Sequence, residues 1–142
     1  MNLKTFTPDV LPARHSGKEP CFQMNSKNGM VRINEAACSL LNLSVKNKLQ
    51  FHQSADDPMD WYVEVVSKNG FLLREKNDKT NGLLMQSSVM VRKIFESINY
   101  EYVSGNLQIA GDPVVFEKRK LYPLITLKLL KWQEDQKELE QE

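Results

Sequence analysis

Short apolar runs recur along the chain and are separated by polar turn residues. Three of the separators are Asn-Gly pairs, at Asn28-Gly29, Asn69-Gly70 and Asn81-Gly82. Asn-Gly between apolar runs is the strongest short-range signal for a β-hairpin. The pattern therefore predicts strand, turn and strand at each site, with strands over residues 21–24, 30–33, 61–66, 71–74 and 83–85.

The first and third turns are each followed by a helical pattern. Apolar residues recur on one face over residues 35–43 and again over residues 88–98. Each stretch is preceded by a residue that caps helix N-termini, Asn34 in the first and Ser87 in the second. We therefore expect two short amphipathic helices that start at equivalent points.

The similarity between the two parts continues beyond the helices. Leu49-Gln50-Phe51 matches Leu107-Gln108-Ile109, and Asp57-Pro58 matches Asp112-Pro113, each ahead of a closing strand at 61–66 or 124–129. We therefore predict an α+β domain of two strand-strand-helix-strand-strand repeats, residues 20–67 and 68–130, forming a pseudo-two-fold mixed sheet or barrel with two short helices. Residues 1–19 are interpreted as a flexible arm, and residues 131–142 as an acidic tail that is a frayed helix or disordered.

Composition and charge place the chain among soluble domains. Its 142 residues include 41% apolar and 26% charged residues, and no apolar run reaches the length of a membrane helix or a signal-peptide core. We expect a cytoplasmic protein without membrane contact, with Cys21 and Cys38 as reduced thiols. The last ten residues hold five acidic residues and one lysine, so the preceding part of the chain has a formal net charge of +5. This charge permits nucleic-acid binding without requiring it.

The first repeat resembles the swapped-hairpin domains of the AbrB and MazE type. The similar residues are 29–43, which read Gly-Met-Val-Arg-Ile-Asn-Glu-Ala-Ala-Cys-Ser-Leu-Leu-Asn-Leu, followed by Lys46-Asn47-Lys48-Leu49-Gln50-Phe51. That family combines a hairpin, a short helix and two more strands, normally as a DNA-binding dimer, and here the second repeat would replace the partner. The family usually has a proline where this chain has Asn34 and Ser87. It also usually has a helix arginine facing DNA, where the first repeat has Cys38 and Ser39.

The segment from Lys48 onward is also similar to the repeats of Whirly and Pur-type single-strand binders, with four strands followed by a helix. This second resemblance implies base stacking on aromatic residues. Its candidate residues are Phe51, Trp61, Tyr62 and Phe71. The competing interpretation, which we favour for Trp61 and Tyr62, is that large aromatic residues in strands fill the core.

Basic residues on or beside the predicted hairpins and on the second helix are the candidate nucleic-acid ligands. These residues are Lys27, Arg32, Arg74, Lys76, Lys79, Arg92 and Lys93. Lysine and arginine on paired loops contact phosphates and release counterions, and arginine also reads guanine edges. The alternative is that lysines beside Asn-Gly turns are only solvated turn residues, and the same choice applies to the basic run Lys118-Arg119-Lys120.

Signals for catalysis are weak, and we predict no enzyme activity, no catalytic residues and no cofactor. His52 as a general base and the Asp56, Asp57 and Asp60 loop as a metal site are minor alternatives. The favoured function is a small nucleic-acid-binding regulator, for which the resemblance implies DNA as the ligand, and the alternative is a non-enzymatic protein-interaction subunit. A continuous basic stripe joining Lys27, Lys76 and Lys79 favours the first, and an exposed apolar patch favours the second. The sequence leaves the oligomeric state open.

Overall fold

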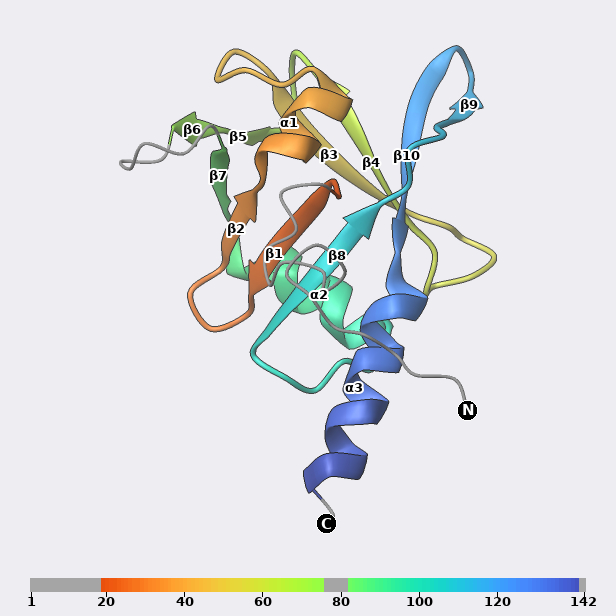
Figure 1. Ribbon diagram of the computed structural model, residues 1–142. Coiled ribbons are helices and arrows are strands. Elements are labelled where there is room, and N and C mark those ends of the chain that lie inside the picture. The colour runs from red at the N-terminus through yellow and green to blue at the C-terminus, as the bar shows by residue number, and fades with distance from the viewer. Residues whose placement is uncertain (1–18, 76–81, 141–142) are drawn as a thin grey trace, which may run out of the picture.

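A computed structural model describes residues 19–75 and 82–140 of the chain (Figure 1). The described residues form ten strands and three helices, which confirms the α+β class. In chain order the elements are β1 (Cys21–Asn25), β2 (Met30–Ile33), α1 (Glu35–Leu41), β3 (Lys48–Gln53), β4 (Trp61–Val66), β5 (Phe71–Leu72), β6 (Arg74–Glu75), β7 (Leu83–Gln86), α2 (Ser88–Ser97), β8 (Ser104–Ile109), β9 (Val114–Phe116), β10 (Arg119–Ile125) and α3 (Thr126–Glu140).

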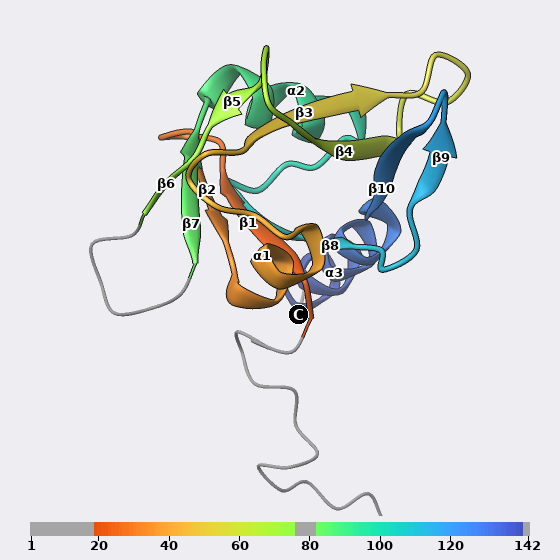
Figure 2. The same cartoon turned by 90° about the horizontal axis from the view of Figure 1, so that it is seen from above.

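The described strands pair in the order β5-β3-β4-β10-β8-β1-β2-β7-β6, and β9 pairs with β10 beside this path. Only Leu73 separates β5 from β6, so the two ends of the order meet and the sheet curls into a nearly closed barrel (Figure 2). Every pairing in these ranges is antiparallel. Of the predicted mixed sheet or barrel, the barrel is therefore confirmed and the mixed sheet is wrong, because α1 leads from β2 to β3, a strand that does not pair with β2.

Two of the three predicted hairpins contain paired strands. β1 pairs with β2 across the Asn28-Gly29 turn, and β6 pairs with β7, although Asn81 lies outside the described residues. The hairpin predicted at Asn69-Gly70 is wrong. The chain does turn there, with Asn69 at a φ of 60°, but β5 crosses to pair with β3 rather than with β4. A turn signal fixes the local bend, and the partner strand is chosen by the core that each side chain reaches.

Both predicted helix starts are confirmed. The Asn34 side chain accepts a hydrogen bond from the N–H of Ala37, and the Ser87 side chain accepts one from the N–H of Met90. Each cap satisfies a backbone donor that has no partner within its helix. The helices end a little earlier than predicted, and α1 stops where Asn42 adopts a left-handed conformation at φ 52°.

The barrel encloses one apolar core. Alternate residues of the strands point inward, and α2 adds Val91, Ile94 and Phe95 to the same cluster. The largest of its fully buried side chains are Phe22, Met24, Ile33, Leu49, Met85, Ile94, Ile98, Leu107 and Ile109. Because inner and outer positions alternate along each strand, the pairing register also determines which residues share the outer face.

The C-terminal part differs from the prediction of a strand over residues 124–129. β10 ends at Ile125, and a third helix, α3, runs from Thr126 to Glu140 (Figure 1). Its buried residues Thr126, Leu129 and Gln133 follow the helical spacing, whereas a short apolar run by itself does not distinguish strand from helix.

The segment expected to be a frayed or disordered acidic tail thus continues α3 through residue 140. Gln133 is buried, accepts a hydrogen bond from the N–H of Glu101 at 2.7 Å and donates one to the carbonyl of Asn99 at 3.2 Å. The Trp132 ring packs against Tyr102 with ring centroids 5.4 Å apart. These contacts hold the helix against residues 99–102. Residues 1–18 of the predicted arm lie outside the described part of the chain.

Candidate nucleic-acid interface

A row of polar residues crosses five adjacent strands on the outside of the barrel. The pairing register places Asn106 opposite Gln23, Gln23 opposite Arg32, Arg32 opposite Leu84, and Leu84 opposite Arg74. Directly opposed residues in an antiparallel sheet point to the same side, and this row is exposed except for the half-buried Leu84. We call these five residues the basic face. Arg32 and Arg74 stand two strands apart on it, a separation of about 10 Å at the usual strand spacing.

The loop between β1 and β2, residues 26–29, lies against the start of α2. The Nε of Arg92 donates a hydrogen bond to the carbonyl of Ser26 at 3.0 Å, and the Nε2 of Gln86 donates one to the carbonyl of Asn28 at 3.0 Å. The N–H of Ser87 donates a further hydrogen bond to the carbonyl of Gly29 at 2.9 Å. The exposed Lys27 therefore projects from a loop that is fixed before any ligand arrives.

Gly29 is required for this contact between the loop and the helix. Its φ is +75°, which side chains rarely adopt, and a Cβ atom placed on it would lie 2.3 Å from the backbone nitrogen of Ser88. The glycine of the predicted turn thus serves two purposes. It closes the hairpin and allows the backbone to touch α2.

The basic side chains of this region form no ion pair with an acid of the described residues. Within the described ranges the ion pairs are His52 with Glu64, Arg119 with Glu64, and Lys137 with Glu101. The candidate residues outside all three pairs are Lys27, Arg32, Arg74, Arg92 and Lys93. The Nη2 of Arg74 approaches the sulfur of Met30, the residue after the loop, at 4.0 Å. Their positive charge is therefore available to an anion.

The structure thus brings some of the predicted residues together. β7 joins Arg32 to Arg74, and the carbonyl of Ser26 joins Arg92 to the loop that carries Lys27. Lys93 is exposed on α2 and belongs to neither group. Lys76 and Lys79 lie outside the described residues.

The amide side chains of this region were not among the predicted site residues. Gln23 and Asn106 complete the row of the basic face, and Gln108 on β8 accepts a hydrogen bond from the Nζ of Lys128 at 2.7 Å. Asn and Gln are suited to reading adenine edges. Their signal in the sequence is the polar position in each alternating strand.

A second polar cluster lies on β3, β4 and β10. Glu64 is only 6% exposed, and its two carboxylate oxygens lie 2.8 Å from the Nε2 of His52 and 3.2 Å from the Nε of Arg119. Glu64 escaped the sequence analysis because its strand reads as core. We call these three residues the Glu64 cluster. The bond to Glu64 fixes the orientation of the His52 ring.

The run Lys118-Arg119-Lys120 is consequently not a simple loop. Lys118 lies in the tight turn between β9 and β10, and the other two residues begin β10. Arg119 is held by Glu64, so it is less free to meet a ligand than the arginines of the basic face.

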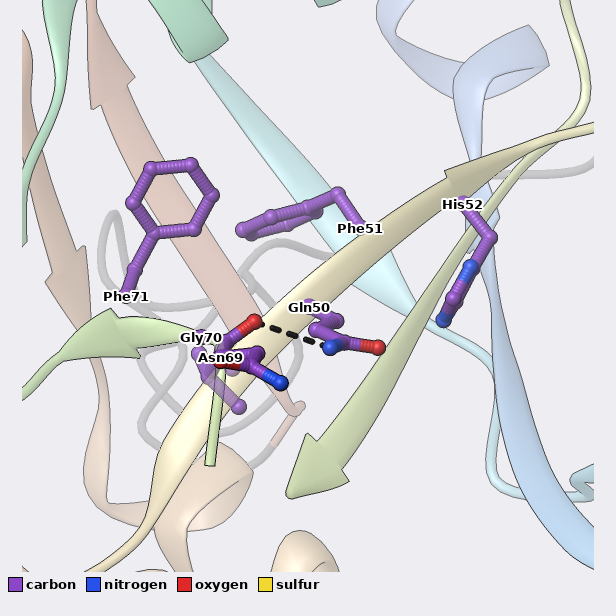
Figure 3. A pocket seen from close by; sticks show the side chains of 7 residues that line it. Gln50, Phe51, His52, Asn69, Gly70 and Phe71 are labelled. Atoms are coloured by element: carbon purple, nitrogen blue, oxygen red, sulfur yellow. Dashed lines mark hydrogen bonds between the residues drawn. The ribbon is translucent and has the colours of Figure 1, made fainter. Parts of the chain in front are cut away.

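A shallow pocket of about 370 Å³ opens where β3 lacks a second neighbour, because β5 pairs only with Lys48 and Leu49. Figure 3 shows Phe51 and Phe71 on one side of β3, with Gln50 and His52 on the other. The Nε2 of Gln50 donates a hydrogen bond to the carbonyl of Asn69 at 2.8 Å. Of the predicted stacking residues, Phe51 and Phe71 line this pocket, whereas Trp61 is buried in the core.

The predicted alternative of a metal site on the aspartate loop finds no support in the described ranges, where no group of three or more His, Cys, Asp or Glu residues is arranged to hold an ion. A hydrogen bond within the loop uses one of these carboxylates instead: that of Asp57 accepts from the N–H of Met59 at 3.0 Å. No helix in residues 19–75 and 82–140 is long and apolar enough to cross a membrane.

Cys21 and Cys38 do not form a disulfide with each other. Burial, with a smaller contribution from the nearby carboxylate of Glu19, raises the pKa of the Cys21 thiol to about 11. A thiol with such a pKa is protonated at neutral pH and is a poor nucleophile or metal ligand.

Comparison of the chain with protein-family models, with curated proteins and with solved structures finds no match. The function is therefore inferred from the chain's own residues and their arrangement.

Proposed function

We propose that this protein binds nucleic acid, and DNA in particular, through the basic face and the β1–β2 loop, as a small regulatory protein. The observation that carries the proposal is the register Arg32, Leu84, Arg74, which sets on one exposed surface two arginines that form no ion pair with a described acid. Such cations bind phosphates and release condensed counterions. The amides of Gln23 and Asn106 in the same row would meet base edges or sugars.

Rigidity supports this proposal. The loop that carries Lys27 is held by hydrogen bonds from Gln86, Ser87 and Arg92. A binding group that is already ordered loses little conformational entropy when its ligand binds. The loop therefore favours binding in a defined orientation.

We further propose that the barrel is an internal duplication of the swapped-hairpin kind. Exchanging β2 with β7, β3 with β8, β4 with β10, and β1 with the β5 and β6 segment gives the same closed strand order. β2 lies beside β7 and β4 beside β10, as expected for elements related by a two-fold axis. The capped helices α1 and α2 follow the equivalent strands β2 and β7.

The test is fluorescence anisotropy of labelled double-stranded and single-stranded oligonucleotides of mixed sequence, measured across a salt series. We expect binding at low salt that weakens steeply as salt rises. Arg32→Glu combined with Arg74→Glu should remove most of the binding. Lys46→Glu combined with Lys68→Glu is the matched control, because it changes the same charge at exposed sites away from the basic face. Absence of binding at low salt, or an equal loss in the control, would contradict the proposal.

We also propose that Lys76 and Lys79, which lie between β6 and β7 in the sequence, bind nucleic acid. Replacing Lys27, Lys76 and Lys79 together by Glu should abolish binding while the thermal unfolding midpoint stays unchanged. Unchanged affinity in this triple variant would exclude the hairpin lysines as ligands.

A second candidate function is binding of single strands at the pocket on β3, which Phe51 and Phe71 line together with the amides of Gln50 and Asn69. An aromatic surface beside amides can stack a base and bond its edge. Under this alternative, Phe71→Leu weakens binding of the single strand and leaves binding of the duplex unchanged, which the same assay measures.

A further inference from the structure

The hairpin of β9 and β10 exposes apolar residues that the nucleic-acid proposal does not use. Val114, Val115 and Phe116 are 47%, 67% and 55% exposed. Among the strands that the structure describes, β9 pairs only with β10 and leaves its other edge open, and Figure 1 shows this hairpin standing away from the barrel. An exposed apolar edge strand is a template for another strand.

The turn of this hairpin determines which backbone groups face outward. Glu117 and Lys118 both have positive φ, at 51° and 68°, as a two-residue type I′ turn requires. Such a turn bonds the carbonyl of Phe116 to the N–H of Arg119, and bonded and free positions then alternate along the strand. The N–H and C=O of Val115 therefore point to the open edge.

The turn of this hairpin has a backbone conformation that is unusual for its residues. Neither Glu117 nor Lys118 is Gly or Asn, the residues that tolerate positive φ most easily. Strained backbone of this kind is found preferentially at functional sites.

We propose that two copies of this chain pair through their β9 strands, antiparallel and about a two-fold axis at Val115. This register sets Val115 against Val115 of the second copy, and Val114 against Phe116. Beyond these paired residues, it brings Asp112 near Lys118 of the second copy, and the two-fold axis repeats this contact once. Both residues are exposed, so their side chains are free to pair.

Self-complementarity identifies a second copy as the partner. In this register the apolar residues meet apolar residues and each acid meets a base, which is the condition for a two-fold interface. Pro113 lacks a backbone N–H and the turn follows Phe116, so the added ladder ends after three residues. The contact forms a closed and weak dimer rather than a fibre, because an edge this short buries little surface.

This inference does not depend on nucleic-acid binding, and its test uses the full chain without nucleic acid. Sedimentation velocity across a series from low micromolar to millimolar protein should show a monomer that converts to a dimer. Asp112→Lys and Lys118→Asp should each weaken the dimer about tenfold. The double variant restores the charge pairs and should return the dimer to near its original strength.

Backbone pairing is tested by Val115→Pro, which removes the outward N–H and leaves the bonds to β10 intact. It should abolish the dimer, and Val115→Thr is the matched control that keeps the N–H and the strand preference. Circular dichroism checks that each variant is folded. A monomer at every concentration, a dimer that survives Val115→Pro, or a double charge variant that stays weak would overturn the proposal. Pairing with a different protein alone would appear as the first of these outcomes.

Discussion

The outer surface of the barrel carries arginines in two contrasting settings. On the basic face, Arg32 and Arg74 flank Leu84 and form no ion pair within residues 19–75 and 82–140, whereas on the opposite strands Arg119 pairs with the buried carboxylate of Glu64. The same side chain is thus available for a ligand in one region and engaged within the fold in the other. The difference is Glu64, whose side chain reaches Arg119 from β4 and forms an ion pair with it, whereas no ion pair joins Arg32 or Arg74 to an acid of the described residues.

The largest expected effect comes from placing an acid between the arginines of the basic face, as Glu64 stands beside Arg119. Leu84→Glu places a carboxylate between Arg32 and Arg74, where it pairs with both guanidinium groups across the strands. We expect nucleic-acid affinity to fall about tenfold or more, since two phosphate-binding charges are neutralised and a negative charge is added. Anisotropy at fixed low salt measures the change.

Leu84→Gln is the control for this experiment, because it has the same shape as Glu without the charge. It should retain most of the affinity. Equal losses in the two variants would mean that the apolar side chain, rather than the charge of the flanking arginines, matters for binding.

The converse change removes the acid from the Glu64 cluster. Glu64→Ala should lower the free energy of unfolding by about 1–3 kcal/mol, measured by urea denaturation, because two hydrogen-bonded charge contacts are lost. The loss is smaller than for a fully buried pair, since the side chains of His52 and Arg119 are 30% and 45% exposed and remain hydrated. Nucleic-acid affinity should rise slightly as Arg119 is released. An unchanged unfolding free energy would show that Glu64 contributes nothing to stability.

The basic face also depends on the support of β1. The Asn34 side chain accepts hydrogen bonds from the N–H groups of Ala37 and Cys21 and donates one to the carbonyl of Glu19, whereas Ser87 caps α2 by one bond from Met90. Asn34→Ala should therefore cost about 2 kcal/mol and Ser87→Ala about 1 kcal/mol in the free energy of unfolding. The reverse order in thermal melting would indicate that the bonds to Cys21 and Glu19 are not stabilising.

The smallest effect concerns Cys21, the first residue of β1, whose thiol is largely removed from solvent and lies near the carboxylate of Glu19. The pKa of Cys21 is raised to about 11, so the folded state holds this proton while the unfolded chain releases it near its usual pKa of about 8.5. The resulting stabilisation is complete below the unfolded pKa and is lost as the pH rises through about 11. In a Cys38→Ala variant, alkylation by iodoacetamide should remain slow at pH 8. Rapid reaction at that pH would show that the thiol is neither buried nor near the acid.

Much of the local structure was predictable from the sequence. Asn34 and Ser87 cap helices where predicted, and the strands at Met30–Ile33 and Trp61–Val66 match their predicted bounds. These features depend on neighbouring residues, whose side chains and turn preferences act over a few positions. The strand partners did not follow in the same way, as β5 shows by pairing with β3 beyond the Asn69-Gly70 turn.

The candidate site was likewise predictable in its local features and not in its contacts between distant residues. The sequence identified Lys27, Arg32 and Arg74 as candidate ligands by residue type and by their place near turns. It did not indicate that β7 would hold the two arginines in one row, or that Glu64 would engage His52 and Arg119. Contacts between residues far apart in the chain depend on the common core that selects the register, which no local pattern contains.

The sequence by itself determined the α+β class, the turns, the helix starts and the supply of basic side chains. The tertiary structure alone decided the antiparallel barrel, the helical course of residues 126–140, the free edge of β9 and the division of arginines into available and engaged. The physical reason is that local preferences amount to a few tenths of a kcal/mol up to about 1 kcal/mol for each residue. Burial of a large apolar side chain contributes about 1.5–3 kcal/mol, so the shared core decides where the local signals compete.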